Sequence, residues 1–343
     1  LENGRNIVNR HYRNKDCAAY GRIPDVLARE DIDGVVIATG DRVHTPASIM
    51  AAKAGKDVYC EKPHSMTIEE GRALVNTCER LGTVYQCGHQ RRSTREYKFL
   101  VEIVKRRLIG KVHTAYVQVW ANSYLRPQAD QPNPPAGLDW DTWLGPSPYH
   151  PFNPSRLSGW NDIWETGNGS IANMGCHYTD IAQWAFDTDD TVPIHYSGTA
   201  TFNPNSFADT PTTARITCTY EDGKKIIVDA SGGFAGRHIR FIGDEGWIKF
   251  SEHIGIFDAK PKSLLKLRGK NLGVGWNSDG HVANFLTCMK TRRRTVCYPE
   301  SSHRATTISH LSNLCARLGR DLKYDPAKER FINDPGADCM LSR

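Results

Sequence analysis

The chain of 343 residues is predicted to be an α/β protein with a parallel-sheet domain followed by a second α/β domain with a large open sheet. Three observations predict this class. The length exceeds that of a typical single core, which favours two domains. Strand and helix patterns alternate through the first third, as βαβ units do. Later strands follow one another through short turns, which indicates a mixed or antiparallel sheet.

The first third is predicted to contain three short strands, each followed by a helix. The strands are residues 34–39, 57–60 and 83–87, and the helices are residues 46–54, 68–80 and a stretch that ends near Leu108. The second helix has the clearest boundaries, because Thr67 with Glu70 three residues later forms a capping box. Gly82 follows as a helix stop. Strands separated by helices of this length favour right-handed crossovers and a parallel sheet.

The pattern changes at Lys111, so we predict domains at residues 1–110 and 111–343. Residues 112–119 alternate as a half-exposed strand does, and a proline-rich loop follows them. A helix over 170–186 leads into several strand patterns. These cover residues 194–202, 213–220, 225–230, 238–242 and 247–250. Two helices over about 278–290 and 300–319 and an irregular tail complete the chain.

Composition excludes several classes of protein. The net charge of +6 arises from 44 basic and 38 acidic residues spread along the chain, and the densest basic clusters fit helix C-termini better than a nucleic-acid surface. The ten cysteines include no C-x-x-C pair, so we predict no metal site and reduced core thiols. No apolar run is long enough to span a bilayer, so we predict no membrane partner.

The first candidate for chemistry is Glu61-Lys62-Pro63, which directly follows the strand at residues 57–60. Ligands of open α/β sheets bind at the carboxyl ends of strands. Lysine also changes its charge readily when buried, which suits it to proton transfer. The alternative is a solvated charge pair at a strand end, which is equally common.

The second candidate is a polar stripe on the helix at residues 170–186. Asn173 and His177 are four residues apart and share a face, and Asp180 continues the stripe. A single histidine on such a helix is more often structural than catalytic. Its asparagine and aspartate neighbours favour the catalytic alternative, because they can fix the tautomer that an acid/base histidine needs.

Residues 167–172 read Gly-Asn-Gly-Ser-Ile-Ala and match the G-x-G-x-x-A pattern of a pyrophosphate loop. A true nucleotide loop follows a buried strand, and the preceding segment, residues 160–166, has no such pattern. We therefore interpret the motif as a turn that opens a helix.

In combination these motifs resemble the Gfo/Idh/MocA family of nicotinamide-dependent oxidoreductases, and the similarity extends over nearly the whole chain. The matching segments are residues 31–39 with His44, residues 54–63, 88–93 and 143–146, the helix from Asn173 to Trp184, and residues 322–326. The resemblance implies a Rossmann-type nucleotide-binding domain, then an α/β domain whose large sheet often supports homodimers or homotetramers.

The resemblance also implies the chemistry: oxidation or reduction of a sugar or polyol with NAD or NADP as cofactor. Lys62 corresponds to the family's lysine beside the nicotinamide, and His177 to the histidine of its Asp-x-x-x-His motif. Asn173 replaces the aspartate of that motif, so Lys62 and His177 are expected to handle the proton. The weaker candidates for substrate binding are Asn173, Asp180, Gln90, Arg92 and Trp143, and those for cofactor binding are Thr39, Asp41, His44, Glu61 and Lys62.

The resemblance further suggests an N-terminal truncation. The family's first strand, glycine-rich turn and second strand have no counterpart after Leu1, so the Rossmann-type domain is expected to be incomplete. We predict a cytoplasmic location, with the alternative that an export signal was lost with the N-terminus.

Two other functions agree with the same residues. Some members of the family cleave glycosides by transient oxidation without net redox change, and others are non-catalytic regulators. Asn173 favours the regulator, whereas Glu61-Lys62-Pro63 and His177 favour an enzyme.

Overall fold

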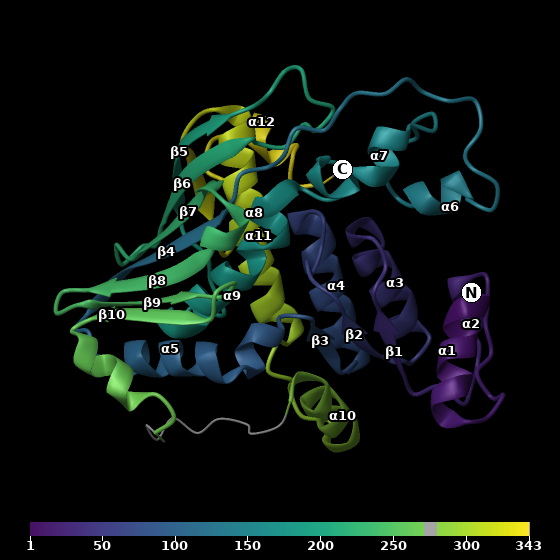
Figure 1. The fold of residues 1–343 in the computed structure, drawn as a ribbon, viewed down its shortest axis with the longest axis horizontal. Helices are drawn as coiled ribbons and strands as arrows, with labels where there is room; N and C mark the ends of the chain where they lie inside the picture. Colours follow the sequence, from purple (N-terminus) through teal and green to yellow (C-terminus); the bar gives the residue numbers. More distant parts are fainter. Residues whose placement is uncertain (271–279, 343) are drawn as a thin grey trace.

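The computed structural model describes residues 1–270 and 280–342. It contains two sheets, a three-stranded sheet of order β1-β2-β3 and a nine-stranded sheet of order β10-β9-β8-β4-β7-β6-β5-β11-β12. Figure 1 shows the large sheet at one end of the molecule and the small sheet with its helices toward the other. The α/β class with a parallel and a mixed sheet is therefore confirmed.

The small sheet is parallel throughout, as the alternation of strands and helices predicts. Its strands are β1 (Gly34–Ile37), β2 (Asp57–Cys60) and β3 (Tyr85–Cys87). Its helices are α3 (Asp41–Lys53) and α4 (Ile68–Leu81). The short helix η1 (Gln90–Ser93) and helix α5 (Arg95–Lys105) follow β3, and α5 packs against the large sheet. Two further helices, α1 (Glu2–Tyr12) and α2 (Ile23–Leu27), lie beyond β1 (Figure 1).

Helix α4 illustrates how local sequence determines an element. The Thr67 side chain accepts a hydrogen bond from the amide of Glu70, and the Glu70 carboxylate accepts one from the amide of Met66. These bonds satisfy amides that the first turn of a helix leaves without partners. Gly82 ends the helix in the left-handed region, with φ at 65°. The predicted start and stop are both confirmed.

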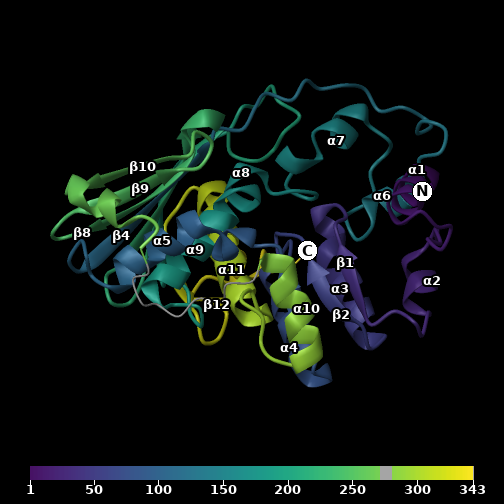
Figure 2. The ribbon, with the colours of Figure 1, turned by 60° about the horizontal axis from the view of Figure 1, so that its bottom comes forward.

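The large sheet is mixed, because β4 is parallel to β7 and antiparallel to β8. Its strands are β4 (Val112–Trp120), β5 (His195–Thr201), β6 (Thr213–Thr219), β7 (Lys225–Gly232), β8 (His238–Gly243), β9 (Trp247–Ser251), β10 (Ile256–Lys260), β11 (Leu322–Asp325) and β12 (Arg330–Phe331). Strands β4 to β9 match the predicted segments to within two residues at each end. Helices α5, α9 and α11 pack against its strands (Figure 2).

The remaining elements lie between or after the strands of the large sheet. They are α6 (Trp140–Leu144), α7 (Pro154–Ser158), η2 (Trp160–Asp162), α8 (Gly169–Asn173), α9 (Gly175–Phe186), η3 (Phe234–Gly236), η4 (Lys262–Leu267), α10 (His281–Thr291), α11 (Pro299–Leu318) and α12 (Pro335–Asp338). Helix α10 returns to the small sheet, where Phe285 and Cys288 pack with Tyr59 and Val84.

Two sequence predictions about these elements are wrong, and a third lies partly outside the described residues. The single helix expected at 170–186 is divided at Met174 into α8 and α9. The tail expected to be irregular contains β11 and β12, which extend the large sheet because β11 pairs with β5. Positions 278–279 of the expected helix 278–290 are not among the described residues, and α10 begins at His281.

The cysteines are consistent with a reduced interior. All ten are free, and eight are buried; Cys17 and Cys339 are the more exposed ones. Burial raises the pKa of Cys60 and of Cys176 to about 12, which keeps these thiols protonated. Across the described ranges, no helix is long and apolar enough to cross a membrane. The same ranges contain no group of three or more histidine, cysteine, aspartate or glutamate side chains arranged to hold a metal ion.

Candidate active site

Lys62 leaves the small sheet at the carboxyl end of β2, its central strand. Hydrogen bonds to both neighbouring strands continue to the end of β2. The amide of Glu61 donates to the carbonyl of Ile37, and the amide of Gly88 donates to the carbonyl of Cys60. The Lys62 side chain is half-buried. It therefore emerges at the edge where parallel sheets bind ligands.

The Lys62 ammonium group is held by one residue of the second domain. Its Nζ donates to both the backbone carbonyl and the side-chain Oδ1 of Asn173, at 3.1 Å each. The Asn173 Nδ2 in turn donates to Oδ1 of Asn161 at 2.6 Å. The sequence predicts Lys62 and Asn173 as members of one site, and the structure brings them into direct contact.

This contact explains why the helix divides at Met174. In a continuous helix the amide of His177 would donate to the carbonyl of Asn173. Here that amide donates to the carbonyl of Met174, at 3.1 Å, and the Asn173 carbonyl is left to accept from Lys62. The helix therefore lacks the hydrogen bond from the His177 amide to the Asn173 carbonyl, and this carbonyl is a fixed acceptor for Lys62.

His177 lies one turn after this break, in the interior. His177 is 5% exposed, and its Nδ1 has no hydrogen-bond partner among the described residues. His89, which is fully buried, meets it edge to face with ring centroids 5.5 Å apart. Burial, followed by the charges of Arg91 and Lys62, holds the pKa of His177 well below its ordinary value. His177 is therefore a neutral imidazole at pH 7.

The buried histidines should make the protein sensitive to acid. Burial lowers the pKa of His89 and His177 well below 6.5 and that of His64 to about 3. Below pH 6.5 the unfolded chain binds protons that the folded chain does not, so stability falls as pH falls. Each such histidine should cost about 2 kcal/mol between pH 7 and pH 5.

Urea unfolding at both pH values measures this loss, and His177→Gln should reduce it by about 2 kcal/mol. The exposed His11 provides the matched control, since His11→Gln should leave the loss unchanged. An equal loss in wild type and His177→Gln would contradict the assignment of His177 as a neutral buried group.

Arg92 and Asp180, predicted to bind substrate, form a buried ion pair with each other. The Arg92 Nε donates to both carboxylate oxygens of Asp180, at 3.0 and 2.8 Å, and its two Nη groups donate to Asp189. Asp180 has no exposed side-chain surface and Arg92 has 3%. Burial raises the pKa of Asp180 to about 6 against the effect of Arg92, so the carboxylate is ionised at pH 7. This geometry favours a structural role for both.

Gln90 and Trp143 also contact protein groups. Gln90 Nε2 donates to Glu61 Oε1 at 2.8 Å and to the Tyr59 hydroxyl at 3.0 Å. The Arg42 guanidinium lies 3.9 Å from the centre of the Trp143 ring, and its Nε donates to the Trp143 carbonyl at 2.6 Å. Both predicted residues therefore support neighbours at the edge of the small sheet, and their contact with substrate stays a prediction.

The cofactor candidates divide into exposed and buried groups. Thr39 is exposed at the carboxyl end of β1. His44 is 1% exposed, and its ring nitrogens lie 3.0 Å from the Pro63 carbonyl and 3.2 Å from the Thr39 carbonyl. His44 thus links the segments that follow β1 and β2 at the carboxyl edge of the small sheet.

Asp41 provides the observation that tests whether this edge fits a nicotinamide group. It begins α3 and is 5% exposed, and its Oδ2 is a buried acceptor without a partner among the described residues. Burial raises the pKa of Asp41 to about 7, and the charges of Lys62 and Arg42 oppose this shift. A buried acceptor without a donor is costly, and an amide or hydroxyl donor of a ligand would satisfy it. The residues fit the reactive end of the cofactor.

The motif at residues 167–172 is a helix-opening turn, as predicted. Asn168 and Gly169 have positive φ angles of 61° and 70° and lead into α8. A Cβ on Gly167 would lie 2.4 Å from the Cα of Asn161, so protein backbone already occupies the space that a pyrophosphate would need.

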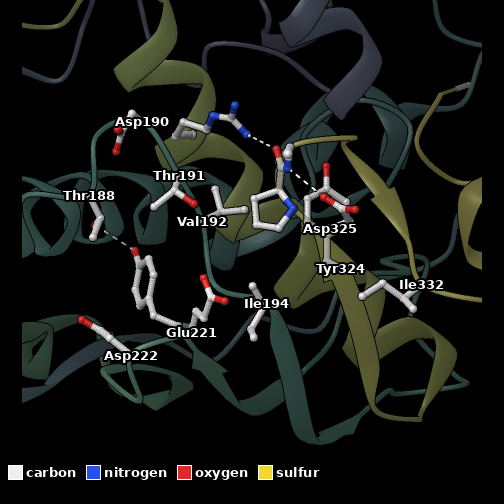
Figure 3. A pocket seen from close by; sticks show the side chains of 14 residues that line it. Thr188, Asp190, Thr191, Val192, Ile194, Glu221, Asp222, Tyr324, Asp325 and Ile332 are labelled. Atoms are coloured by element: carbon white, nitrogen blue, oxygen red, sulfur yellow. Dashed lines mark hydrogen bonds between the residues drawn. The ribbon is translucent and has the colours of Figure 1, made fainter.

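A broad open pocket of about 900 Å³ lies elsewhere, between the loop at 188–194 and the β11–β12 hairpin. Figure 3 shows its lining, in which the Thr188 hydroxyl donates to the hydroxyl of Tyr220 and Arg304 donates to the Pro326 carbonyl. None of the predicted site residues lines it. We therefore assign the candidate active site to the Lys62–Asn173–His177 group (the Lys62 site).

Three residues near the Lys62 site are missed by the sequence reasoning: Asn161, His89 and Arg91. Asn161 lies in the short helix η2, in a segment without a motif. Arg91 directly precedes Arg92, and the sequence carries no signal that the two side chains point to different partners. His89 follows Gly88 in the matched segment 88–93, which was the available signal.

Comparison with known proteins agrees with the fold. Residues 111–343 match the family model described as the C-terminal alpha/beta domain of an oxidoreductase family, Gfo/Idh/MocA. Residues 5–89 match the same family's NAD-binding Rossmann fold.

Individual relatives are more distant. The chain is 29% identical over 111 residues to a 2,7-anhydro-N-acetylneuraminate hydratase of Mediterraneibacter gnavus, covering 32% of this chain and 29% of that protein. It is 24% identical over 179 residues to a 1,5-anhydro-D-fructose reductase of Ensifer adhaerens, covering 52% of this chain and 45% of that protein. The chain thus spans less than half the length of both relatives.

Among solved structures, an aldose-aldose oxidoreductase from Caulobacter crescentus, complexed with glycerol, superposes with a TM-score of 0.68 at 16% identity, covering 94% of this chain and 89% of that chain. This likeness shows the fold. The family models together match residues 5–89 and 111–343, and the chain belongs to the Gfo/Idh/MocA family of NAD(P)-dependent oxidoreductases.

Proposed function

We propose that this protein oxidises a hydroxyl group, or reduces a carbonyl group, of a sugar or polyol with NAD or NADP, using Lys62 and His177 for proton transfer. The observation that carries the proposal is the double hydrogen bond from Lys62 Nζ to Asn173, at the carboxyl edge of the small sheet. Sugars are the substrates suggested by the names of the hydratase, the reductase and the aldose oxidoreductase.

The two acceptors on Asn173 prepare Lys62 for both directions of the reaction. A neutral amine has two N–H groups and one lone pair. With both N–H groups donated to Asn173, the lone pair points away and is available for the proton of a substrate hydroxyl. In the reverse direction the ammonium form has a third N–H, which can donate to a substrate carbonyl oxygen. Asn173 therefore acts as a positioning residue.

His177 supplies a second polar group to the same substrate. Its buried Nδ1 lacks a partner and the imidazole is neutral, so it can accept a hydrogen bond from a hydroxyl group. Because Asn173 has no titratable group, the proton that leaves the hydroxyl passes to Lys62 or His177. A positioned general base of this kind contributes about 10²–10⁴-fold in rate.

The nicotinamide ring, when bound, exchanges a hydride with the carbon of the reacting alcohol or carbonyl. Thr39, Asp41 and Glu61 are the residues of this chain that would hold that end of the cofactor, because they line the carboxyl edge beside Lys62. The Asp41 carboxylate would accept from an amide or hydroxyl of the cofactor.

A panel of sugars and polyols with each nicotinamide tests the proposal, read by the absorbance of the reduced cofactor. At least one member should give turnover that depends on Lys62. A panel without any such turnover, alongside measured cofactor binding, would favour a non-catalytic regulator.

Asn173→Ala should separate positioning from chemistry. It removes the Oδ1 acceptor and leaves the backbone acceptor of Lys62, so Nζ loses one of two restraints. We expect kcat to fall about 10- to 100-fold with little change in KM, because misplacing a catalytic group by about 1 Å costs that much. Asn161→Ala, which removes the partner of Asn173 Nδ2, should give a smaller fall in kcat. Unchanged kcat in Asn173→Ala would contradict the positioning role.

A second candidate function keeps the cofactor but has no net redox change. A relative named as a hydratase favours it, since addition of water consumes no oxidant. The sugar would be oxidised transiently, with its hydride held by the nicotinamide and its hydroxyl proton by the Lys62 site, which activates a neighbouring C–O bond for elimination. Water would then add to the unsaturated sugar, and return of the hydride would restore the alcohol. Release of an aglycone without net change in nicotinamide absorbance would distinguish this function from simple dehydrogenation.

The expected homodimer or homotetramer and the cytoplasmic location remain proposals. Light scattering on the purified protein tests the first, and fractionation of the producing cells tests the second.

A further inference from the structure

Two arginines converge on one glutamate beside the Lys62 site. Arg91 lies in η1, Arg237 precedes β8, and Glu252 follows β9. Glu252 Oε2 accepts from Arg91 Nη2 at 2.7 Å and lies 3.7 Å from Arg237 Nε, and it also accepts from the Tyr178 hydroxyl at 3.2 Å. The side chains of both arginines are 12% exposed and that of Glu252 is 27% exposed.

The topology of the large sheet explains why these residues meet. Strands β4 and β7 are parallel, and β8 is antiparallel to β4 and β9. Strands β4, β7 and β9 therefore run in the same direction, and their carboxyl ends share one edge. Trp120, Phe234 and Glu252 stand at or just beyond those ends. Helix α8, which carries Asn173, packs against β4 and β7 (Figure 1).

Arg91 links this edge to the Lys62 site. Its Nη2 lies 3.4 Å from the Met174 sulfur, and Met174 is the residue at which α8 ends and α9 begins. Among charged side chains, Arg91 has the largest effect on the pKa of His177, and Lys62 has the next largest. A molecule that contacts His177 is therefore within the field of the Arg91 guanidinium.

The two guanidinium groups are incompletely satisfied. The Nε atoms of Arg91 and Arg237 are buried and have no hydrogen-bond partner within the described part of the chain. Native proteins rarely leave buried donors unpaired, and such donors often mark a ligand or water site. Two positive groups also face a single carboxylate, and Lys62 adds a third positive group nearby. The local charge is complementary to an anion.

Aromatic side chains adjoin the guanidinium groups. Phe234 is 54% exposed. The Arg237 guanidinium lies 4.1 Å from the centre of the Phe234 ring, and the centre of the Trp120 ring lies 5.0 Å from the centre of the Phe234 ring. The Arg237 Nη1 donates to the Phe234 carbonyl at 2.9 Å, which holds the short helix η3 in place. An exposed aromatic face suits the apolar face of a sugar ring.

We propose that Arg91 and Arg237 form a subsite for the anionic group of an acidic sugar, with Phe234 beside the sugar ring. The inference rests on the proposed function, because it assigns the substrate of the same site to sugars that carry a carboxylate or a phosphate. Arginine suits both groups, because its planar fork donates two parallel hydrogen bonds to either. Glu252 holds the two guanidinium groups in place and weakens their attraction for the ligand.

The test measures binding, without turnover, of three hexoses that differ at one carbon: D-glucuronate, D-glucose 6-phosphate and D-glucose. Calorimetry on the natural protein should give a dissociation constant at least about ten-fold lower for one of the two anionic sugars than for D-glucose. The two anionic probes distinguish a carboxylate ligand from a phosphate ligand.

Two substitutions, one that removes a positive charge and one that removes a negative charge, make the test specific. Arg237→Gln should weaken binding of the anionic sugar about ten-fold and leave D-glucose unchanged. Glu252→Gln should strengthen binding of the anionic sugar and again leave D-glucose unchanged, a gain that a misfolded variant cannot produce. Arg215→Gln is the matched control, since Arg215 is exposed on β6 and lies over Tyr116. Circular dichroism checks the fold of each variant.

Equal affinity for all three sugars would overturn the inference, as would variants that change charged and neutral sugars alike. The two proposals can fail separately. Turnover of neutral sugars alone would refute the anionic subsite and leave the oxidoreductase function intact. Binding of an anionic sugar without any nicotinamide-linked reaction would do the reverse.

Discussion

Lys62→Met is expected to lower kcat about 10²–10⁴-fold, because it removes the group that we propose exchanges a proton with the reacting oxygen. Methionine keeps the length and the apolar stem of lysine, so the packing around Pro63 should be retained. The affinity for substrate should change much less than kcat, since the proton moves only as the bond to hydrogen breaks. Steady-state kinetics with the active member of the sugar panel measures both quantities.

Lys53→Met is the matched control, because Lys53 is exposed in the last turn of α3, in the same domain, and should leave kcat unchanged. Lys62→Arg should recover little activity, since arginine does not release its proton near neutral pH. A Lys62→Met enzyme that retains more than about a tenth of wild-type kcat would exclude Lys62 as the main proton-transfer group.

The second large effect concerns folding. Arg92→Met should destabilise the protein by about 3–5 kcal/mol, because it leaves the fully buried Asp180 carboxylate without its partner. Asp189, whose side chain is 24% exposed, can regain water, so Asp189→Asn should cost less. Urea unfolding at pH 7 measures these changes in the free energy of unfolding.

Arg330→Met serves as control for the loss of an arginine ion pair. Its partner is Glu69, and the two side chains are 50% and 43% exposed, so the expected cost is only about 0–1 kcal/mol. The double variant Arg92→Met with Asp180→Leu should recover much of the loss, since an apolar pair can replace a buried ion pair. A cost below about 1 kcal/mol for Arg92→Met would contradict a structural role for the pair.

The sequence predicts the elements whose information is local. The start and stop of α4 follow from Thr67, Glu70 and Gly82, and the small sheet follows from apolar runs spaced by helices. The position of Lys62 at the end of β2 follows in the same way. The fold class and the position of Lys62 at the carboxyl edge of the small sheet are therefore predictable from the sequence.

Long-range pairing could not be predicted from these patterns. Arg92 and Asp180 are residue types that often bind substrates, and the sequence does not show that they pair with each other. Their ion pair joins residues 88 positions apart. At the division of α8 from α9, the Asn173 carbonyl accepts from the Lys62 side chain, which comes from 111 positions earlier. Strand β11 is short and becomes a strand because β5 offers it an edge. In each case tertiary contacts override or complete the local signal.

Asn173 illustrates how the same residue is interpreted before and after the structure is known. From the sequence alone, Asn173 means the loss of a titratable carboxylate, because it replaces the aspartate of the family motif. In the structure its carbonyl and its side-chain oxygen both accept from Lys62, which supports the proposed positioning role without a charge.

Transfer of deuterium tests most directly whether this protein moves hydride between a sugar and a nicotinamide. Sugars and polyols deuterated at each carbinol carbon are incubated with the oxidised cofactor, and the reduced nicotinamide is examined by mass spectrometry. We expect deuterium in the nicotinamide with the wild-type protein and Lys53→Met, and a greatly slowed appearance with Lys62→Met. Absence of label with every substrate, or equal rates in wild type and Lys62→Met, would contradict the assignment of Lys62 to this chemistry.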